Sequence, residues 1–240
     1  MIGSLALEER GLEIKAFAYI RTSEYANAVV AASLLHYVFG FPTDDGRTPE
    51  ENHQRATREV QDLARICLSY LNVLNQEVDK LAHLIAAGES KRLEFKSTLR
   101  WDLKQSRQNP ELSHAVLKTI AAFLNTDGGT LLVGIADDGT PIGIEKDQFP
   151  NDDKFSLHLM NLVKSSIGEV AATFVEMAFI KYRDVRVARV DCRPSPSPVY
   201  LRPNKGQHEE FYVRMGPGST PLGPRELVTY IRERFPNSVS

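Results

Sequence analysis

Apolar positions follow two different periods along the chain. Between Val60 and Ile85 they recur at alternating spacings of four and three residues, the period of a helix that buries one long stripe. Beyond Gly88 the pattern changes to strict alternation and short apolar runs between turn residues. We therefore predict an α+β protein with an all-α helical region over residues 1–87 and a mixed α+β domain over residues 88–240.

The long helix is predicted to begin at Thr48-Pro49-Glu50, because threonine caps a helix, proline fits its first position and glutamate complements its dipole. Its stripe favours a helical hairpin or bundle with segments 5–20 and 24–39, or a homodimer through these helices, over a lone two-stranded coiled coil. The heptad positions of the stripe are Val60, Ala64, Cys67, Leu71, Leu74, Val78, Leu81 and Ile85.

Alternation, apolar runs and turn residues predict the elements of the second region. Leu93-Glu94-Phe95-Lys96 alternates as a strand does, and residues 130–135 are apolar on both faces, as in a central strand. Asp137-Asp138-Gly139-Thr140 predicts a tight turn. Helices are expected near 110–124, 153–167 and 224–235, and further strands near 172–182, 185–192, 199–202 and 210–214.

The two regions differ in charge. Residues 1–85 carry 8 basic and 12 acidic side chains, whereas residues 86–240 carry 21 basic and 19 acidic ones. The net charge of -2 therefore conceals a mildly basic second region, which leaves a nucleic-acid partner open. With 42% hydrophobic and 25% charged residues, the composition excludes a disordered polyelectrolyte. Cys67 and Cys192 show no disulfide or zinc-ligand spacing, so we expect a cytoplasmic protein.

No membrane partner is expected. The N-terminus lacks the basic start of a signal peptide and soon reaches Glu8-Glu9. The longest apolar stretch, residues 25–41, is 17 residues long and is interrupted by polar side chains. It falls short of the roughly 20 residues that a bilayer span needs, so we predict a buried amphipathic helix there.

Candidate catalytic residues surround the first strand of the second region. Glu94 and Lys96 are two positions apart, so they face the same side of a strand. Glu89 approaches them only if the chain changes direction at Gly88, and Asp137 follows the central strand. A metal-dependent nuclease needs a carboxylate, which holds the cation, and a lysine, which stabilises the charge of the phosphate. Oxygen ligands favour Mg²⁺ or Mn²⁺, whereas the alternative is solvated acids and a surface ion pair.

Basic residues supply a second candidate site. They crowd the segment after the first strand and recur around the later strands, with Trp101 available to stack on a base. The alternative is that they are the ordinary charged outer faces of strands. The candidate nucleic-acid-binding residues are Lys91, Arg92, Arg100, Trp101, Lys104, Arg107, Arg186, Arg202, Lys205 and Arg214.

Several enzyme classes are excluded by missing motifs. The sequence contains no G-x-x-x-x-G-K-[ST], G-x-S-x-G or H-E-x-x-H, and its histidines show no ligand spacing. Gly128-Gly129-Thr130 precedes a strand rather than a helix, so it does not predict a phosphate-binding loop. No nucleotide cofactor is therefore expected.

Two blocks carry a resemblance to a known family. They are ESKRLEFK at residues 89–96 and TIAAFLNTDGGTLLVGIADDG at residues 119–139, and both resemble the Schlafen AlbA_2 domain. FYVRMG at residues 211–216, followed by Ser219-Thr220, is similar to the closing strand of that domain. The resemblance covers roughly residues 88–236 and does not include residues 1–85.

The resemblance implies a mixed sheet with flanking helices in the second region. It also implies nucleic-acid binding and, in Schlafen proteins, a Mg²⁺- or Mn²⁺-dependent endoribonuclease that acts on structured RNA such as tRNA. The three acids of the family's active site fall on Glu89, Glu94 and Asp137, which would hold the metal, and its lysine falls on Lys96. Ala136 departs from the many members that carry a further acid there, and Asp138 is an alternative to Asp137.

Schlafen nucleases join two such domains around a groove, which this chain would achieve as a homodimer. The alternative function is a non-catalytic DNA- or RNA-binding module with a regulatory role.

Overall fold

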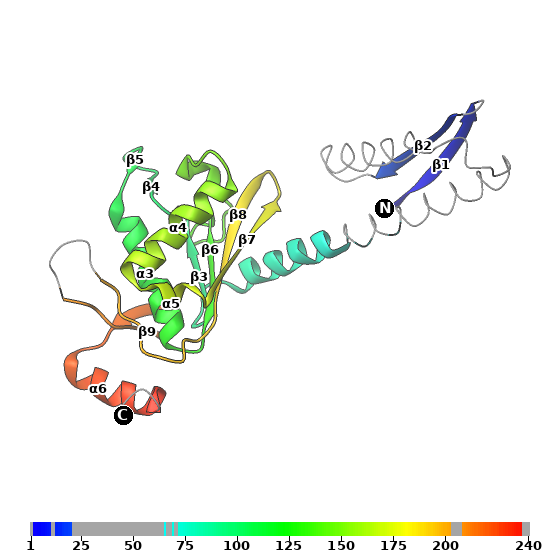
Figure 1. Ribbon diagram of the computed structural model, residues 1–240. Helices are drawn as coiled ribbons and strands as arrows, with labels where there is room; N and C mark the ends of the chain where they lie inside the picture. The colour runs from blue at the N-terminus through cyan, green and yellow to red at the C-terminus, as the bar shows by residue number, and fades with distance from the viewer. Residues whose placement is uncertain are drawn as a thin grey trace. The chain divides into compact units, whose positions relative to one another are not determined.

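The computed structural model describes residues 2–10, 13–20, 65, 69, 72–202 and 208–236. The chain divides into two compact units, Met1–Gln76 and Glu77–Ser240 (Figure 1). Within the described parts of the chain, no helix is both long enough and apolar enough to cross a membrane. The apolar stretch 25–41 lies outside the described residues.

The first unit contains an antiparallel strand pair, β1 (Ile2–Arg10) and β2 (Glu13–Ile20), whose backbone register places residue 8 opposite residue 15. The sequence analysis expected a helix over residues 5–20, and the strands replace it. Residues 13–16 alternate charged and apolar side chains, a period of two that suits a strand. The rest of the predicted bundle, including segment 24–39 and the predicted helix start at residues 48–50, lies outside the described residues.

The second unit is built on a mixed four-stranded sheet in the order β3-β6-β8-β7. The edge strand β3 runs parallel to β6, and the other neighbours are antiparallel. This arrangement confirms the predicted mixed sheet with flanking helices. The strands are β3 (Leu93–Lys96), β6 (Gly129–Val133), β7 (Val175–Tyr182) and β8 (Val185–Cys192).

One face of the sheet is covered by two long helices, α3 (Pro110–Asn125) and α4 (Asp152–Ser166). Their apolar sides meet alternate residues of β6 and β8 in the main core, which contains Ile120, Phe123, Leu131, Leu159 and Val190. A 3₁₀ turn, η1 (Ile144–Asp147), precedes α4, and a short helix, α5 (Glu169–Ala172), follows it.

The opposite face of the sheet is covered by the last turns of the helix at residues 72–87. Leu81 is fully buried there against Phe95, Leu132 and Val187, with the heptad positions Val78 and Ile85 packed beside it. The end of the predicted heptad stripe therefore packs on the sheet of its own chain. The compact unit consequently begins at Glu77, eleven residues before the boundary drawn from sequence.

Two small antiparallel pairs extend the second unit: β4 (Trp101–Asp102) with β5 (Arg107–Gln108), and β9 (Tyr212–Met215) with β10 (Gly218–Pro221). Helix α6 (Pro224–Arg234) packs on the second pair through a small core around Phe211 and Phe235. Sequence patterns missed β4 and β5 because strands of two residues are too short to show alternation, and they missed β10 because its sequence, Gly-Ser-Thr-Pro, has no apolar–polar alternation.

Two residues of the block at residues 119–139, which resembles the Schlafen AlbA_2 domain, hold parts of the fold together. Asn125, fully buried at the end of α3, donates to the carbonyl oxygens of Val199 and Tyr212 and accepts from the N–H of Val199 at 2.9 Å. Gly128 has a φ of +75°, and a Cβ there would meet the carbonyl oxygen of Cys192 at 2.5 Å. This asparagine and this glycine therefore join the helix end, the sheet and the closing strand.

Candidate functional site at the edge strand

Strand β3 separates apolar from charged side chains. Leu93 and Phe95 are buried in the core beneath the helix at residues 72–87. Glu94 and Lys96 lie on the other side of the strand, where they are partly buried. The alternation of the sequence thus places the acid and the lysine together.

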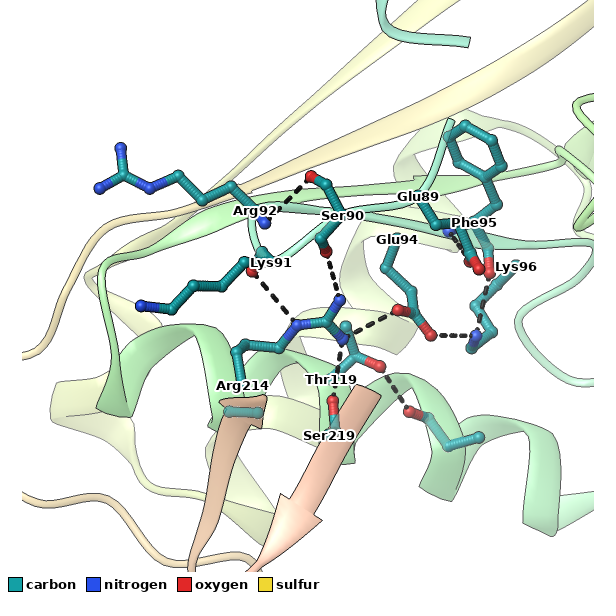
Figure 2. A network of polar contacts seen from close by, with 12 residues as sticks. Glu89, Ser90, Lys91, Arg92, Glu94, Phe95, Lys96, Thr119, Arg214 and Ser219 are labelled. Carbon is teal, nitrogen blue, oxygen red and sulfur yellow. Dashed lines mark hydrogen bonds and ion pairs between the residues drawn. The ribbon is translucent and has the colours of Figure 1, made fainter. Parts of the chain in front are cut away.

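Both carboxylate oxygens of Glu94 are occupied by cations (Figure 2). Oε1 accepts a hydrogen bond from Nζ of Lys96 at 2.5 Å, and Oε2 accepts one from Nη1 of Arg214 at 2.8 Å. The Glu94 side chain is only 12% exposed and that of Arg214 is fully buried. The negative charge of Glu94 is therefore balanced within the fold.

Arg214 reaches this site from β9, about 120 residues further along the chain. Its guanidinium also donates to the carbonyl oxygens of Ser90 (2.7 Å) and Lys91 (3.3 Å) and to Oγ of Ser219 (3.1 Å), and it lies 4.8 Å from the ring centroid of Phe123. The sequence analysis placed Arg214 among the nucleic-acid-binding residues. That assignment is corrected, because a fully buried guanidinium with four partners has no surface for a ligand.

Glu89 lies on the turn that follows Gly88, whose φ of +72° ends the preceding helix. The Glu89 side chain is exposed, and its Oε1 accepts a hydrogen bond from the N–H of Phe95 at 2.9 Å. Because β3 is an edge strand, this carboxylate satisfies a backbone donor that the sheet leaves unpaired.

Asp137 is exposed on the turn after β6, two residues beyond Ile135, whose N–H donates to the carbonyl oxygen of Lys96 at 3.3 Å. The neighbouring Asp138 accepts from the N–H of Thr140 at 2.8 Å, a hydrogen bond that lowers the pKa of the Asp138 carboxyl. Within the described part of the chain, no three acidic, histidine or cysteine side chains are grouped so that they could hold a metal ion. Glu94 is already paired with Lys96 and Arg214, so a metal held by Glu89, Glu94 and Asp137 would have to displace one of these cations, and that metal site stays a prediction.

A positively charged surface lies at the start of β3. Lys91 contacts Oδ2 of Asp127 at 2.7 Å, and Arg92 lies 3.9 Å from the same oxygen. Arg234 of α6 donates to the neighbouring carbonyl oxygen of Thr126 at 3.0 Å. The hydrogen bond from Lys91, and to a lesser extent the charges of Arg92 and Arg234, lower the pKa of the Asp127 carboxyl. We call Lys91, Arg92 and Arg234 the cationic corner; the sequence analysis missed Arg234 because it lies more than 140 residues from the other two.

The remaining predicted basic residues have varied surroundings. Arg186 pairs with Glu145 and Asp152, and Arg202 pairs with Glu209 beside a surface cavity of about 290 Å³. Lys205 lies outside the described residues.

The residues after β3 make fewer ion pairs. Arg100 donates to the carbonyl oxygens of Asp147 and Gln148 and stacks on Phe149 at 3.6 Å, and Trp101 is half-buried. Lys104 and Arg107 are exposed and, within the described residues, neither forms an ion pair.

The fold and this charged edge define a class of α/β domain: a mixed four-stranded sheet between helices, with a paired acid and lysine on its edge strand. Residues 89–223 match the family Schlafen, AlbA_2, and the match spans more than half of the 240 residues. The chain belongs to the Schlafen AlbA_2 family.

Solved structures with similarity to this chain include the DIP2311 protein of Corynebacterium diphtheriae, at 21% identity and a TM-score of 0.46. That similarity covers 67% of this chain and 29% of the other, so this chain spans less than a third of that protein. Another is the N-terminal domain of an ATP-dependent DNA helicase RecG-related protein from Nitrosomonas europaea, at 25% identity and a TM-score of 0.38. This similarity covers 60% of this chain and 89% of the other. No curated protein matches the sequence.

Proposed function

We propose that the second unit is a nucleic-acid-binding domain and that the cationic corner contacts the phosphate backbone. The observation that carries this proposal is the gathering of three cations around Asp127: Lys91 and Arg92 pair with its carboxylate, and Arg234 binds the neighbouring carbonyl oxygen of Thr126. Membership of the Schlafen AlbA_2 family supports the same proposal, because resemblance of a chain to this family implies nucleic-acid binding.

The charges of the corner are available to a ligand. The side chains of Lys91 and Arg92 are 53% and 69% exposed, so they approach phosphates without a large loss of hydration. The buried guanidinium of Arg214 holds the carbonyl groups of Ser90 and Lys91. The turn is therefore fixed before a ligand arrives, which reduces the entropy lost on binding.

Fluorescence anisotropy with labelled RNA and DNA tests the proposal. Replacing both Lys91 and Arg92 by alanine should weaken binding about tenfold and reduce the slope of log K against log [salt] by about 2, because two phosphate contacts are lost. The matched control is the double variant K154A/K164A, which removes the same charge from exposed positions of α4. A wild-type protein that binds no nucleic acid at low salt contradicts the proposal.

An endoribonuclease is the second candidate. The observation that favours it is that Glu89 and Glu94 both lie at β3 with Lys96, directly beside the corner. The family resemblance implies Mg²⁺ or Mn²⁺ held by Glu89, Glu94 and Asp137, which would require Glu94 to exchange a cationic partner for the metal.

Incubation of the full chain with tRNA and Mn²⁺ separates the two candidates. A nuclease should produce fragments that disappear with EDTA and in the variants E94A and D137A. A non-catalytic module should bind the same RNA equally well with and without EDTA, and cleavage that survives both substitutions would point to a contaminant.

A homodimer formed through residues 1–87 would contain two cationic corners, one from each chain. A groove lined by two Schlafen domains requires such a pair. Analytical ultracentrifugation of the full chain and of a chain that begins at residue 77 tests this. Loss of the dimer only in the shorter chain is the expected result, because the shorter chain retains the compact second unit.

A further inference from the structure

The β4–β5 hairpin presents cations that the fold does not use. Trp101 pairs with Gln108 and Asp102 with Arg107, so residues 103–106 form the tip. Leu103, Lys104 and Arg107 are all exposed, and Leu103 is 43% exposed although it is apolar. Figure 1 shows β4 and β5 at the outer end of the second unit, beyond the end of β3.

The tip is held in one conformation by a side chain at its base. Oδ1 of Asp102 accepts hydrogen bonds from the N–H groups of Lys104 and Gln105, both at 2.9 Å, and Oδ2 accepts one from Nδ2 of Asn109 at 3.2 Å. These bonds, the one from Gln105 first, lower the pKa of the Asp102 carboxyl. Both oxygens of the Asp102 carboxylate are therefore bound to the turn, and Arg107 on the facing strand acts on this carboxylate only through its charge.

The base of the hairpin is anchored in the core. The fully buried carboxylate of Asp147 accepts from the N–H groups of Leu99 (2.8 Å), Arg100 (2.7 Å) and Trp101 (3.0 Å). On the other strand, the N–H of Asn109 donates to the carbonyl oxygen of Arg100 at 2.8 Å. A hairpin of two-residue strands would be unstable alone, and these contacts fix where its tip projects.

Among the described residues, the cations of the tip are not held by an ion pair, although the charge of Arg107 acts on Asp102. Nε of Arg107 donates to Oε1 of Gln105 at 2.7 Å, and in the described residues neither Lys104 nor Arg107 forms an ion pair. By contrast, Arg186, Arg189, Arg202 and Arg214 each form at least one. Leu103 stands exposed beside these cations, so the tip offers a ligand an apolar contact as well as charged ones.

We propose that the β4–β5 hairpin inserts into a groove of double-helical nucleic acid, with Lys104 and Arg107 on the phosphates and Leu103 against the sugars and bases within the groove. This inference rests on the proposed nucleic-acid-binding function and adds a contact at the opposite end of β3 from the cationic corner. A two-stranded ribbon fits a groove, and an apolar side chain at its tip makes contacts there. Single strands are instead recognised by exposed aromatic side chains, and the tip has none.

The test is fluorescence anisotropy of the full chain with a labelled 20-base-pair DNA duplex, an RNA duplex of the same sequence and the corresponding single strands, at about 50 to 300 mM salt. The variant K104A/R107A should weaken duplex binding about tenfold and reduce the salt slope by about 2. Leu103→Ala should weaken duplex binding several-fold without changing the slope, because it removes no charge. K154A/K164A is the control at matched charge, and the comparison of DNA with RNA identifies the kind of helix.

The outcomes distinguish this inference from the function on which it rests. If the wild-type protein binds no nucleic acid, the proposed function fails. If the wild-type protein binds and K91A/R92A weakens binding while K104A/R107A behaves like K154A/K164A, only the hairpin inference is overturned. Equal loss of affinity for single strands and duplexes in K104A/R107A would also overturn it, because it would show that no groove is read.

Discussion

The segment 89–96 and the hairpin at residues 101–108 are close in sequence and rich in charge, yet they use their charges differently. Around β3, Glu94 is enclosed by Lys96 and Arg214, and Glu89 caps a backbone N–H. On the hairpin, Lys104 and Arg107 point to solvent without an ion pair in the described residues. The contrast shows that burial, rather than residue type, decides whether a charge maintains the fold or is available to a ligand.

The largest expected effect is on the buried pair. Arg214→Ala should lower the free energy of unfolding by about 3 to 5 kcal/mol, because Glu94 is left partly buried without its guanidinium. Urea denaturation measures this. The control is Arg202→Ala, which breaks an exposed pair with Glu209 and should cost under about 1 kcal/mol. Equal effects of the two substitutions would mean that the Arg214 contacts are not a main support of the fold.

A smaller effect is expected at the anchor of the hairpin. Asp147→Asn should cost roughly 2 to 3 kcal/mol, because an amide replaces one acceptor oxygen by a donor that faces backbone N–H groups. It should also weaken duplex binding, since the tip is no longer fixed. The exposed Asp153→Asn on α4 is the control for both measurements.

The pH dependence of the same variant provides a separate prediction. Burial raises the pKa of the Asp147 carboxyl above its usual 3.8, so the folded state binds this proton more tightly than the unfolded state does. The stability that Asp147 contributes is then greatest below its usual pKa and is lost as the pH rises through the raised value. The stability difference between wild type and Asp147→Asn should therefore shrink as the pH rises, and a difference that grows with pH would contradict this.

The smallest effect is expected at the cationic corner. Asp127→Asn removes the acid that Lys91 and Arg92 share, so affinity for nucleic acid should rise about threefold while stability changes by under about 1 kcal/mol. Anisotropy titration against Asp153→Asn measures the gain. Unchanged affinity would place the phosphate contacts elsewhere, with the hairpin as the next surface to examine.

The sequence predicted the elements whose pattern is long. The helices α3, α4 and α6 and the strands β3, β6, β7 and β8 follow from apolar periods and from glycine and proline positions, whereas the mixed sheet was expected from the family resemblance. The hairpin β4–β5 was missed, and residues 5–20 were predicted as helix although they form β1 and β2. A short or weakly alternating segment contains too little local information, because its conformation depends on what packs against it.

By itself, the sequence determined the family, the alternation that puts Glu94 and Lys96 on one side of β3, and the presence of excess positive charge after Gly88. Only the tertiary structure decided which charges pair. It brings Arg214 to Glu94 and Arg234 to the corner from more than a hundred residues away, and it leaves Lys104 and Arg107 in solvent. The physical reason is that an ion pair depends on distance in space and on burial, neither of which local sequence spacing specifies.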